Sequence, residues 1–132
     1  YERKNVLRLG PKPYIRLPEF LKAFNVGIIP FKVDEVSHTI FPLKLYEYLG
    51  AGLPTVCTPF NPDVLNDLGE VAAVAGTPAD FAAALQDALD NDSDDKRQTR
   101  FEIAQQNTWQ ARGLEFAELL QEQVDKNHNT PI

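Results

Sequence analysis

Short apolar runs alternate with amphipathic segments along the chain, a pattern typical of a parallel sheet covered by helices. Four apolar runs predict strands at residues 6–9, 26–31, 55–58 and 71–74. The run at 26–31 is the most apolar, so we expect it to be the central strand. Helices between these runs are expected to begin at Pro18, Pro42 and Asp63. The predicted fold is therefore α/β, a three-layer Rossmann-like domain with a parallel sheet.

Three more helices are predicted in residues 77–125, which we assign to the same single domain, residues 1–132. Thr77 and Asp80 form a capping box, so a helix should run from Pro78 to about Asn91. The acidic run at 92–95 suits the start of a second helix, where carboxylates complement the helix dipole, and we do not interpret it as a metal site.

Thr108 is the predicted cap of the last helix, and Trp109 at its start is interpreted as a packing anchor. Helical spacing predicts an apolar stripe on the first and on the last of these three helices. The expected inward residues are Phe81, Ala84, Leu85, Ala88 and Leu89 in the first helix, and Phe116, Leu119, Leu120 and Val124 in the last.

The most informative stretch is residues 42–54. Pro42 suits the first position of a helix, and Gly50 and Gly52 followed by Pro54 should end that helix after two or three turns. Its apolar residues cover nearly the whole circumference, so we expect the helix to be largely buried. They are Leu43, Leu45, Tyr46, Tyr48 and Leu49.

This helix also carries Lys44 and Glu47, which are three residues apart and share one face. Phe41, the expected N-cap, has no side-chain acceptor, so the first helical N–H groups are left for an anion, to which Lys44 adds positive charge. One turn on, Glu47 can accept two hydrogen bonds from a vicinal diol. The arrangement suits a nucleoside diphosphate. The alternative is a helix ion pair worth ~0.3–0.5 kcal/mol and no more.

Loops that follow parallel strands meet at the carboxyl edge of the sheet, where ligands of such sheets bind. The loops at 11–17, 32–40 and 58–63 should therefore form one rim. Tyr14 in the first loop could stack on a nucleobase, although an aromatic side chain there more often packs locally. His38 in the second loop could contact a phosphate or a sugar, or simply be exposed.

Composition limits the kinds of partner. The formal net charge of −6 and the pI of about 4.8 argue against nucleic acid or an anionic membrane as a broad-surface partner. No apolar run approaches the ~20 residues that span a bilayer, and Cys57, the single cysteine, is expected in the core. We expect a cytoplasmic location, with peripheral contact to the inner membrane face through another domain as an option.

The order of motifs resembles the donor-binding half of GT-B glycosyltransferases, a large group 1-type family with many bacterial cell-envelope sugar transferases. The resemblance is carried by Pro42-Leu43-Lys44-Leu45-Tyr46-Glu47-Tyr48-Leu49, by the following Gly50-Ala51-Gly52-Leu53-Pro54-Thr55-Val56, and by residues 5–10, 17–21, 25–31 and 108–112. In that family the residue matching Glu47 binds the ribose hydroxyls of the nucleotide.

The resemblance implies a nucleotide-diphosphate sugar as substrate, no separate cofactor, no metal, and a role in glycan or cell-envelope polysaccharide biosynthesis. It also implies an N-terminal acceptor-binding domain, and the start of the donor domain, ahead of Tyr1. The fragment alone should therefore be inactive. The donor-binding residues it implies are Glu47, Lys44, Leu43, Pro42, Thr39, His38 and Tyr14.

One position departs from the family pattern. Retaining members typically carry a second Glu eight positions before the ribose-binding one, and here that position is Thr39. The catalytic residues and the stereochemical outcome are therefore left unassigned.

Two other functional classes stay open. One is a non-catalytic nucleotide or nucleotide-sugar binding module. The other is a signalling-type doubly wound domain, which would need an acidic cluster where this chain has Gly10-Pro11-Lys12-Pro13.

Overall fold

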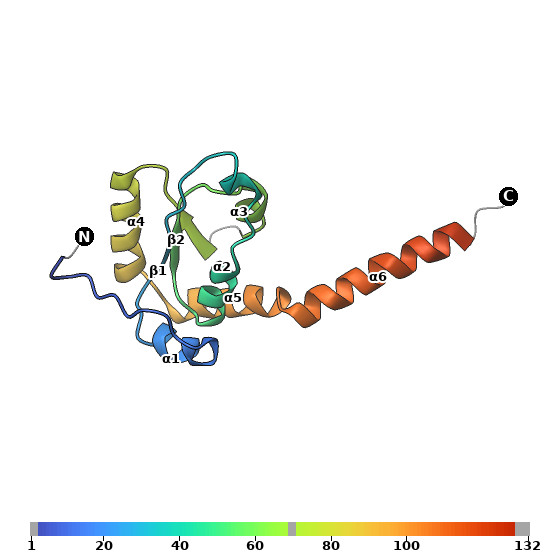
Figure 1. Ribbon diagram of the computed structural model, residues 1–132, viewed down its shortest axis with the longest axis horizontal. Coiled ribbons are helices and arrows are strands. Elements are labelled where there is room, and N and C mark those ends of the chain that lie inside the picture. The colour runs from blue at the N-terminus through green and yellow to red at the C-terminus, as the bar shows by residue number, and fades with distance from the viewer. Residues whose placement is uncertain (1–2, 69–70, 129–132) are drawn as a thin grey trace.

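The computed structural model describes residues 3–68 and 71–128 (Figure 1). Short strands alternate with helices in the first part of the chain, and helices alone make up the last part. In chain order the elements are η1 (Tyr14–Arg16), α1 (Leu17–Leu21), β1 (Gly27–Ile29), η2 (Ser37–Thr39), α2 (Leu43–Gly50), β2 (Thr55–Cys57), α3 (Pro62–Leu68), β3 (Ala72–Val74), α4 (Pro78–Asp90), α5 (Asp94–Gln106) and α6 (Trp109–His128).

The described strands form a parallel sheet in the order β1-β2-β3. Gly27 pairs with Thr55 in the first ladder, and Val56 pairs with Ala73 in the second. Helix α4 lies on one side of this sheet, and α2 and α3 lie on the other (Figure 1). Parallel strands are stable when helices cover both faces, and the structure meets this requirement at β2. The predicted α/β, Rossmann-like class is confirmed.

Two strand predictions are wrong. Residues 6–9 form no strand, and their side chains are exposed, with Leu7 81% exposed. Within the described part of the chain no strand pairs with them. An apolar run becomes a strand only where a neighbouring strand pairs with its backbone N–H and C=O groups. The most apolar run contains β1, but β1 lies at the edge of the described sheet and β2 at its centre. All three residues of β2 are buried, because helices cover both of its faces.

The core lies between α2 and the sheet. Its fully buried side chains are Leu45 and Leu49 from α2, Val56 and Cys57 from β2, and Phe60 from the loop after β2. The ring of Phe60 meets Phe31 edge to face, with 5.2 Å between the ring centroids. Burying a leucine side chain stabilises a fold by about 1.5–3 kcal/mol, so Leu45 and Leu49 fix α2 firmly against the sheet. The core position predicted for Cys57 is confirmed.

The close packing of α2 on β1 depends on a glycine. A Cβ atom on Gly27 would lie 2.7 Å from Cγ of the Tyr48 ring, so only glycine leaves room for that ring. Sequence patterning places Gly27 in a strand, but the need for a glycine there is clear only from the packing of α2 against β1.

Helix α4 begins as predicted. The Thr77 hydroxyl accepts a hydrogen bond from the backbone N–H of Asp80 at 3.2 Å, and it also contacts the Asp80 carboxylate at 2.7 Å. Four residues of the predicted stripe, Phe81, Ala84, Leu85 and Ala88, are half-buried. The fifth, Leu89, is 54% exposed, so its assignment to the inward stripe is wrong. It lies in the last turn of α4.

Helix α5 is held by a buried arginine that the sequence patterns did not single out. The Arg100 side chain is 4% exposed and donates to both carboxylate oxygens of Asp92, at 2.7 and 2.9 Å. Its Nε also donates to the backbone carbonyl of Gly52 at 3.0 Å. The chain just after α2 is therefore tied to α5. Asp92, from the acidic run, serves here as an ion-pair partner.

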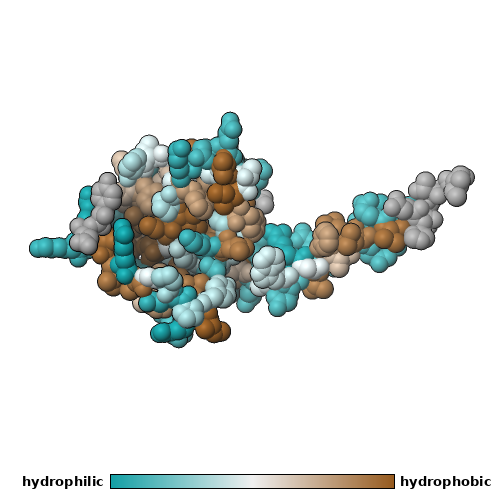
Figure 2. Space-filling view, in the orientation of Figure 1, coloured by the Kyte–Doolittle hydropathy of each residue, from teal (hydrophilic) through white to brown (hydrophobic). Residues whose placement is uncertain are grey.

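Helix α6 runs away from the rest of the molecule (Figure 1). Its predicted cap is confirmed, because the Thr108 hydroxyl accepts from the Ala111 backbone N–H at 3.2 Å. The prediction that Trp109 is a packing anchor is wrong, since this side chain is 80% exposed. The predicted stripe is exposed too, and apolar surface follows the helix in Figure 2. Its residues, Phe116, Leu119, Leu120 and Val124, are 47–63% exposed because little of the described chain faces them.

Candidate functional site

The start of α2 has no side-chain cap. The helix begins at Leu43, and Pro42 is its N-cap, with φ −86° and ψ 98°, one position later than predicted. No side chain hydrogen-bonds to the first turn from the cap position, as expected when the cap lacks an acceptor. The backbone N–H of Leu45 donates to the Pro42 carbonyl at 3.0 Å, so the N–H groups of Leu43 and Lys44 are the ones that could bind an anion. The fixed φ of Pro42 sets the direction in which the chain enters the helix.

Burial of α2 is less complete than its composition predicted. Leu45 and Leu49 are fully buried and Tyr46 and Tyr48 are half-buried, but Leu43 is 54% exposed. The expectation of burial around the whole circumference is therefore wrong at the first turn. Leu43 and Lys44 at the start of this turn are exposed, whereas Leu45 beside them is buried.

Lys44 and Glu47 do not form the ion pair of the simpler interpretation. No Lys44–Glu47 contact is among the ion pairs of residues 3–68 and 71–128. Lys44 is exposed, while Glu47 is half-buried. A half-buried carboxylate that is not neutralised by its helical neighbour is available for another hydrogen-bonding partner.

Glu47 lies where two cavities meet. One has a volume of about 440 Å³ and the other about 410 Å³. The two cavities share four of their lining residues, Tyr14, Glu47, Gly50 and Phe101. Glu47 is the acidic side chain that lines them, so a ligand entering either cavity meets its carboxylate.

The first cavity is apolar and lies between α2 and the η1–α1 segment. Its further lining residues include Ile15, Leu17, Pro18 and Leu21, with Lys22 at one side. A slot of this composition suits a flat, mostly apolar group, with Glu47 as a polar contact that fixes its orientation.

The second cavity lies between α2 and the junction of α5 and α6. Aromatic residues dominate it: Phe41 and Tyr46 stack with ring centroids 5.3 Å apart, and Trp109 also lines the wall. Arg112 contributes a cation, donating to Asn107 Oδ1 at 2.6 Å and to Glu115 Oε2 at 3.1 Å. Its hydrogen bond to Glu115 raises the pKa of Arg112, which therefore stays charged.

The charge of Glu47 acts on two tyrosines. It raises the pKa of the Tyr14 phenol, first through its charge and then through hydrogen bonding. The pKa of Tyr48 is also raised, mainly by burial and secondarily by the charge of Glu47. Both phenols therefore remain protonated near neutral pH, and Tyr14 can donate a hydrogen bond to this carboxylate.

Two of the three predicted rim loops are joined at the carboxyl end of the sheet. The Thr58 hydroxyl donates to the carbonyl of Phe31 at 2.7 Å, and the Asn61 amide donates to the carbonyl of Ile40 at 3.1 Å. The loop before η2 is closed by Ser37 and Asp34, each accepting from the other's backbone N–H.

The predicted site residues fall into two groups. Tyr14, Leu43 and Glu47 line the cavities, and Pro42 is buried at the helix start next to them. Lys44, His38 and Thr39 are exposed and line neither cavity. The Thr39 hydroxyl donates to the carbonyl of Val36 at 2.9 Å, within its own 3₁₀ turn.

Sequence reasoning missed Phe101 and Arg112 as cavity residues and assigned Trp109 to packing. These residues are far from α2 in the chain, so no local spacing connects them to Glu47. A tryptophan and an arginine three residues apart at a helix start were the only signal available.

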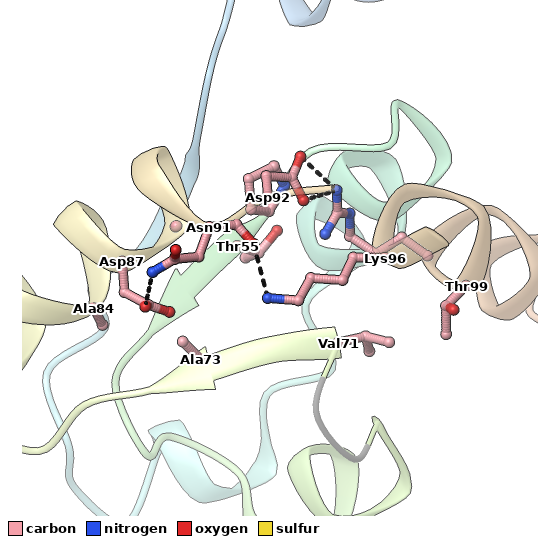
Figure 3. Close-up of a pocket in the computed structure, with 12 residues that line it drawn as sticks. Thr55, Val71, Ala73, Ala84, Asp87, Asn91, Asp92, Lys96 and Thr99 are labelled. Atoms are coloured by element: carbon pink, nitrogen blue, oxygen red, sulfur yellow. Dashed lines mark hydrogen bonds and ion pairs between the residues drawn. The ribbon is translucent and has the colours of Figure 1, made fainter. Parts of the chain in front are cut away.

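A third cavity, of about 270 Å³, lies between α4, α5 and the sheet (Figure 3). Its charged groups are already paired: Arg100 donates to Asp92 at 2.7 Å, and Lys96 donates to the carbonyl of Asn91 at 2.9 Å. We therefore do not consider it the functional site.

Two kinds of feature are not found among the described residues. In the part of the chain with assigned structure, no group of three or more His, Cys, Asp or Glu side chains could hold a metal ion. Among the helices at 3–68 and 71–128, none combines the length and the apolar character needed to cross a bilayer.

Comparison with known proteins gives two matches. Residues 2–91 match the family described as "Glycosyl transferases group 1". Over 108 residues the chain is 31% identical to the "Putative teichuronic acid biosynthesis glycosyltransferase TuaH" of Bacillus subtilis (strain 168). That alignment covers 80% of this chain and 27% of the relative, so the chain spans about a quarter of that protein's length. No solved structure matches.

Proposed function

Because the chain belongs to the glycosyl transferases group 1 family, we propose that it binds the nucleotide-diphosphate sugar from which the enzyme transfers a glycosyl group. The observation that carries this proposal is the position of Glu47. Its half-buried carboxylate lies one turn from an uncapped helix start and lines two cavities at once. A ligand with an anionic group and a diol suits these two features.

Each part of the donor has a complementary feature. The helix N-terminus and the nearby Lys44 favour the diphosphate, because N–H groups and a cation both stabilise negative charge there. Glu47 accepts the two ribose hydroxyls. The apolar cavity between α2 and η1–α1 holds the nucleobase, and Tyr14 forms part of its wall. Phosphate, ribose and base then lie in the order that the nucleotide requires.

Transfer needs a second substrate held close to the sugar, and we propose that a separate acceptor-binding domain of the same polypeptide provides this in a GT-B arrangement. The relative's much greater length supports a further domain. So does the exposed apolar stripe of α6, formed by Phe116, Leu119, Leu120 and Val124. The described chain alone should therefore bind donor without transferring sugar.

The printed name of the relative, which refers to teichuronic acid biosynthesis, supports a biosynthetic role. We propose a role in cell-envelope polysaccharide biosynthesis. We also propose that it takes place in the cytoplasm, with the acceptor domain contacting the inner membrane face.

A non-catalytic nucleotide-sugar binding module is the second candidate. Thr39, at the place of the family's usual second Glu, is the observation that favours it. Measurable sugar transfer by the full-length protein would exclude it.

The central test is Glu47→Gln, measured by calorimetric titration of the full-length protein with UDP, GDP and ADP and with the parent nucleosides. Hydrogen bonds to a charged acceptor are worth roughly 1.5–3 kcal/mol, so affinity should fall by about tenfold or more for both ligand classes. Lys44→Ala should weaken diphosphate binding much more than nucleoside binding.

Glu102→Gln, an exposed carboxylate on α5 outside the cavities, is the matched control and should change nothing. Unchanged affinity in Glu47→Gln, with a lowered melting temperature, would mean that Glu47 serves the fold and not the ligand.

A further inference from the structure

Tyr14 and Glu47 come from separate elements and meet where the two cavities join. Tyr14 begins η1, Glu47 lies in the middle of α2, and both residues line both cavities. The Tyr14 side chain is 76% exposed, so burial of its ring contributes little to holding it there. Its phenol lies near enough to Glu47 for the charge of that carboxylate to raise the pKa of Tyr14.

We propose that Tyr14 is an internal competitor for Glu47: its phenol donates to the carboxylate in the empty site, and a ribose diol displaces it. This inference rests on the proposed function, because the incoming group is the ribose of the nucleotide. A phenol offers one O–H donor, whereas a vicinal diol offers two that can reach both carboxylate oxygens. The exchange therefore favours ligands with both ribose hydroxyls and selects against deoxy sugars.

The ring of Tyr14 and its hydroxyl then have opposite effects on binding. The hydroxyl must be displaced, so it weakens the affinity for any ligand that uses Glu47. The ring lines the apolar cavity next to Ile15 and Leu17, so it supports a flat group bound there. The two effects distinguish the proposal from a purely structural role of Tyr14. If the role were structural, removing the hydroxyl and removing the whole ring would change the ligand affinity in the same direction.

The test compares Tyr14→Phe with Tyr14→Ala in the full-length protein, titrated with UDP, GDP and ADP and with their 2′,3′-dideoxy analogues. Tyr14→Phe should raise the affinity for the ribonucleotide that binds best by about two- to fivefold, because the unliganded variant no longer has a phenol–carboxylate hydrogen bond that the ligand must displace. It should not change the affinity for the dideoxy analogue. Tyr14→Ala should weaken both ligands through loss of the cavity wall.

Unchanged or weaker ribonucleotide binding in Tyr14→Phe would overturn the proposal, as would equal tightening of the ribo and dideoxy ligands. Phe41→Leu, at an exposed ring that lines only the second cavity, is a control that should not distinguish the ribo ligand from its dideoxy analogue.

A second measurement needs no nucleotide. With ¹³C-labelled tyrosine, the ionisation of Tyr14 is followed by NMR in the unliganded protein, with and without Glu47→Gln. Removing the carboxylate charge should lower the Tyr14 pKa towards its ordinary value, and an unchanged pKa would show that the contact does not exist.

The two measurements separate the two hypotheses. If the wild-type protein binds none of the nucleotides, the proposed function fails even where the tyrosine titration confirms the contact. If nucleotides bind and Tyr14→Phe does not tighten them, only the competition fails.

Discussion

Replacing Arg100 by methionine should cost about 3 kcal/mol of stability. Methionine keeps the apolar stem of the side chain but removes three hydrogen bonds, two to Asp92 and one to the Gly52 carbonyl. A buried acceptor left without a partner costs ~1–3 kcal/mol, and breaking a buried ion pair costs roughly 3–5 kcal/mol. The expected loss lies at the lower end of the ion-pair range because the Asp92 side chain is 20% exposed and can regain water.

The assay is thermal unfolding followed by circular dichroism at neutral pH. For a chain of 132 residues, each 1 kcal/mol shifts the melting temperature by roughly 3–5 °C, so Arg100→Met should lower it by about 10–15 °C.

Arg97 provides a matched control. Its guanidinium also approaches Asp92, at 3.9 Å, but its side chain is 55% exposed. Exposed ion pairs are worth about 0–1 kcal/mol, so Arg97→Met should lower the melting temperature by only a few degrees, and by less in 1 M salt. If both variants lost the same stability, burial would not be what gives the Arg100 contacts their value. A loss below ~1 kcal/mol for Arg100→Met would also refute the reasoning.

Two further predictions concern the core and the turn after α2. Gly52→Ala should destabilise the fold by about 1–3 kcal/mol, because φ is +71° at this position and a Cβ atom would lie 2.8 Å from Arg97 Cγ. The control is Gly76→Ala, which should be nearly neutral in the same melting assay because a Cβ atom there meets nothing within 4 Å. Burial raises the pKa of the Cys57 thiol from 9.0 to about 11, so its folded form holds the proton more tightly, and the free energy of unfolding should fall as the pH rises from 9 to 11. Denaturant titrations of Cys57→Ala should show a shallower fall over this range, and an identical slope in both proteins would contradict the assignment.

Local patterns were sufficient for the elements whose signals lie within one stretch of chain. The capping residues Thr77 and Thr108 predicted where two helices begin, and Gly50 with Gly52 predicted where α2 ends, because a cap is satisfied by groups a few residues away. Alternation of apolar runs with helices predicted the α/β class for the same reason. The uncapped start of α2 and the position of Glu47 on that helix also follow from neighbouring residues alone.

Burial and partnership could not be predicted in this way. Residues 6–9 read as a strand, but a strand exists only where another strand completes its hydrogen bonds, and the described sheet offers none. The apolar stripe of α6 follows helical spacing, yet it is exposed because the spacing specifies a face and not what covers it.

The helix that carries Glu47, its uncapped start and the class of the fold can therefore be predicted from local patterns, since they depend on short-range geometry. Long-range packing is what places Tyr14, Phe101 and Trp109 in one cavity with that carboxylate, and what ties α5 to the turn after α2 through Arg100. These residues are brought together by the packing of α2 between the sheet and α5. Contacts between segments distant in the chain depend on the shape of the whole core, which no local pattern contains.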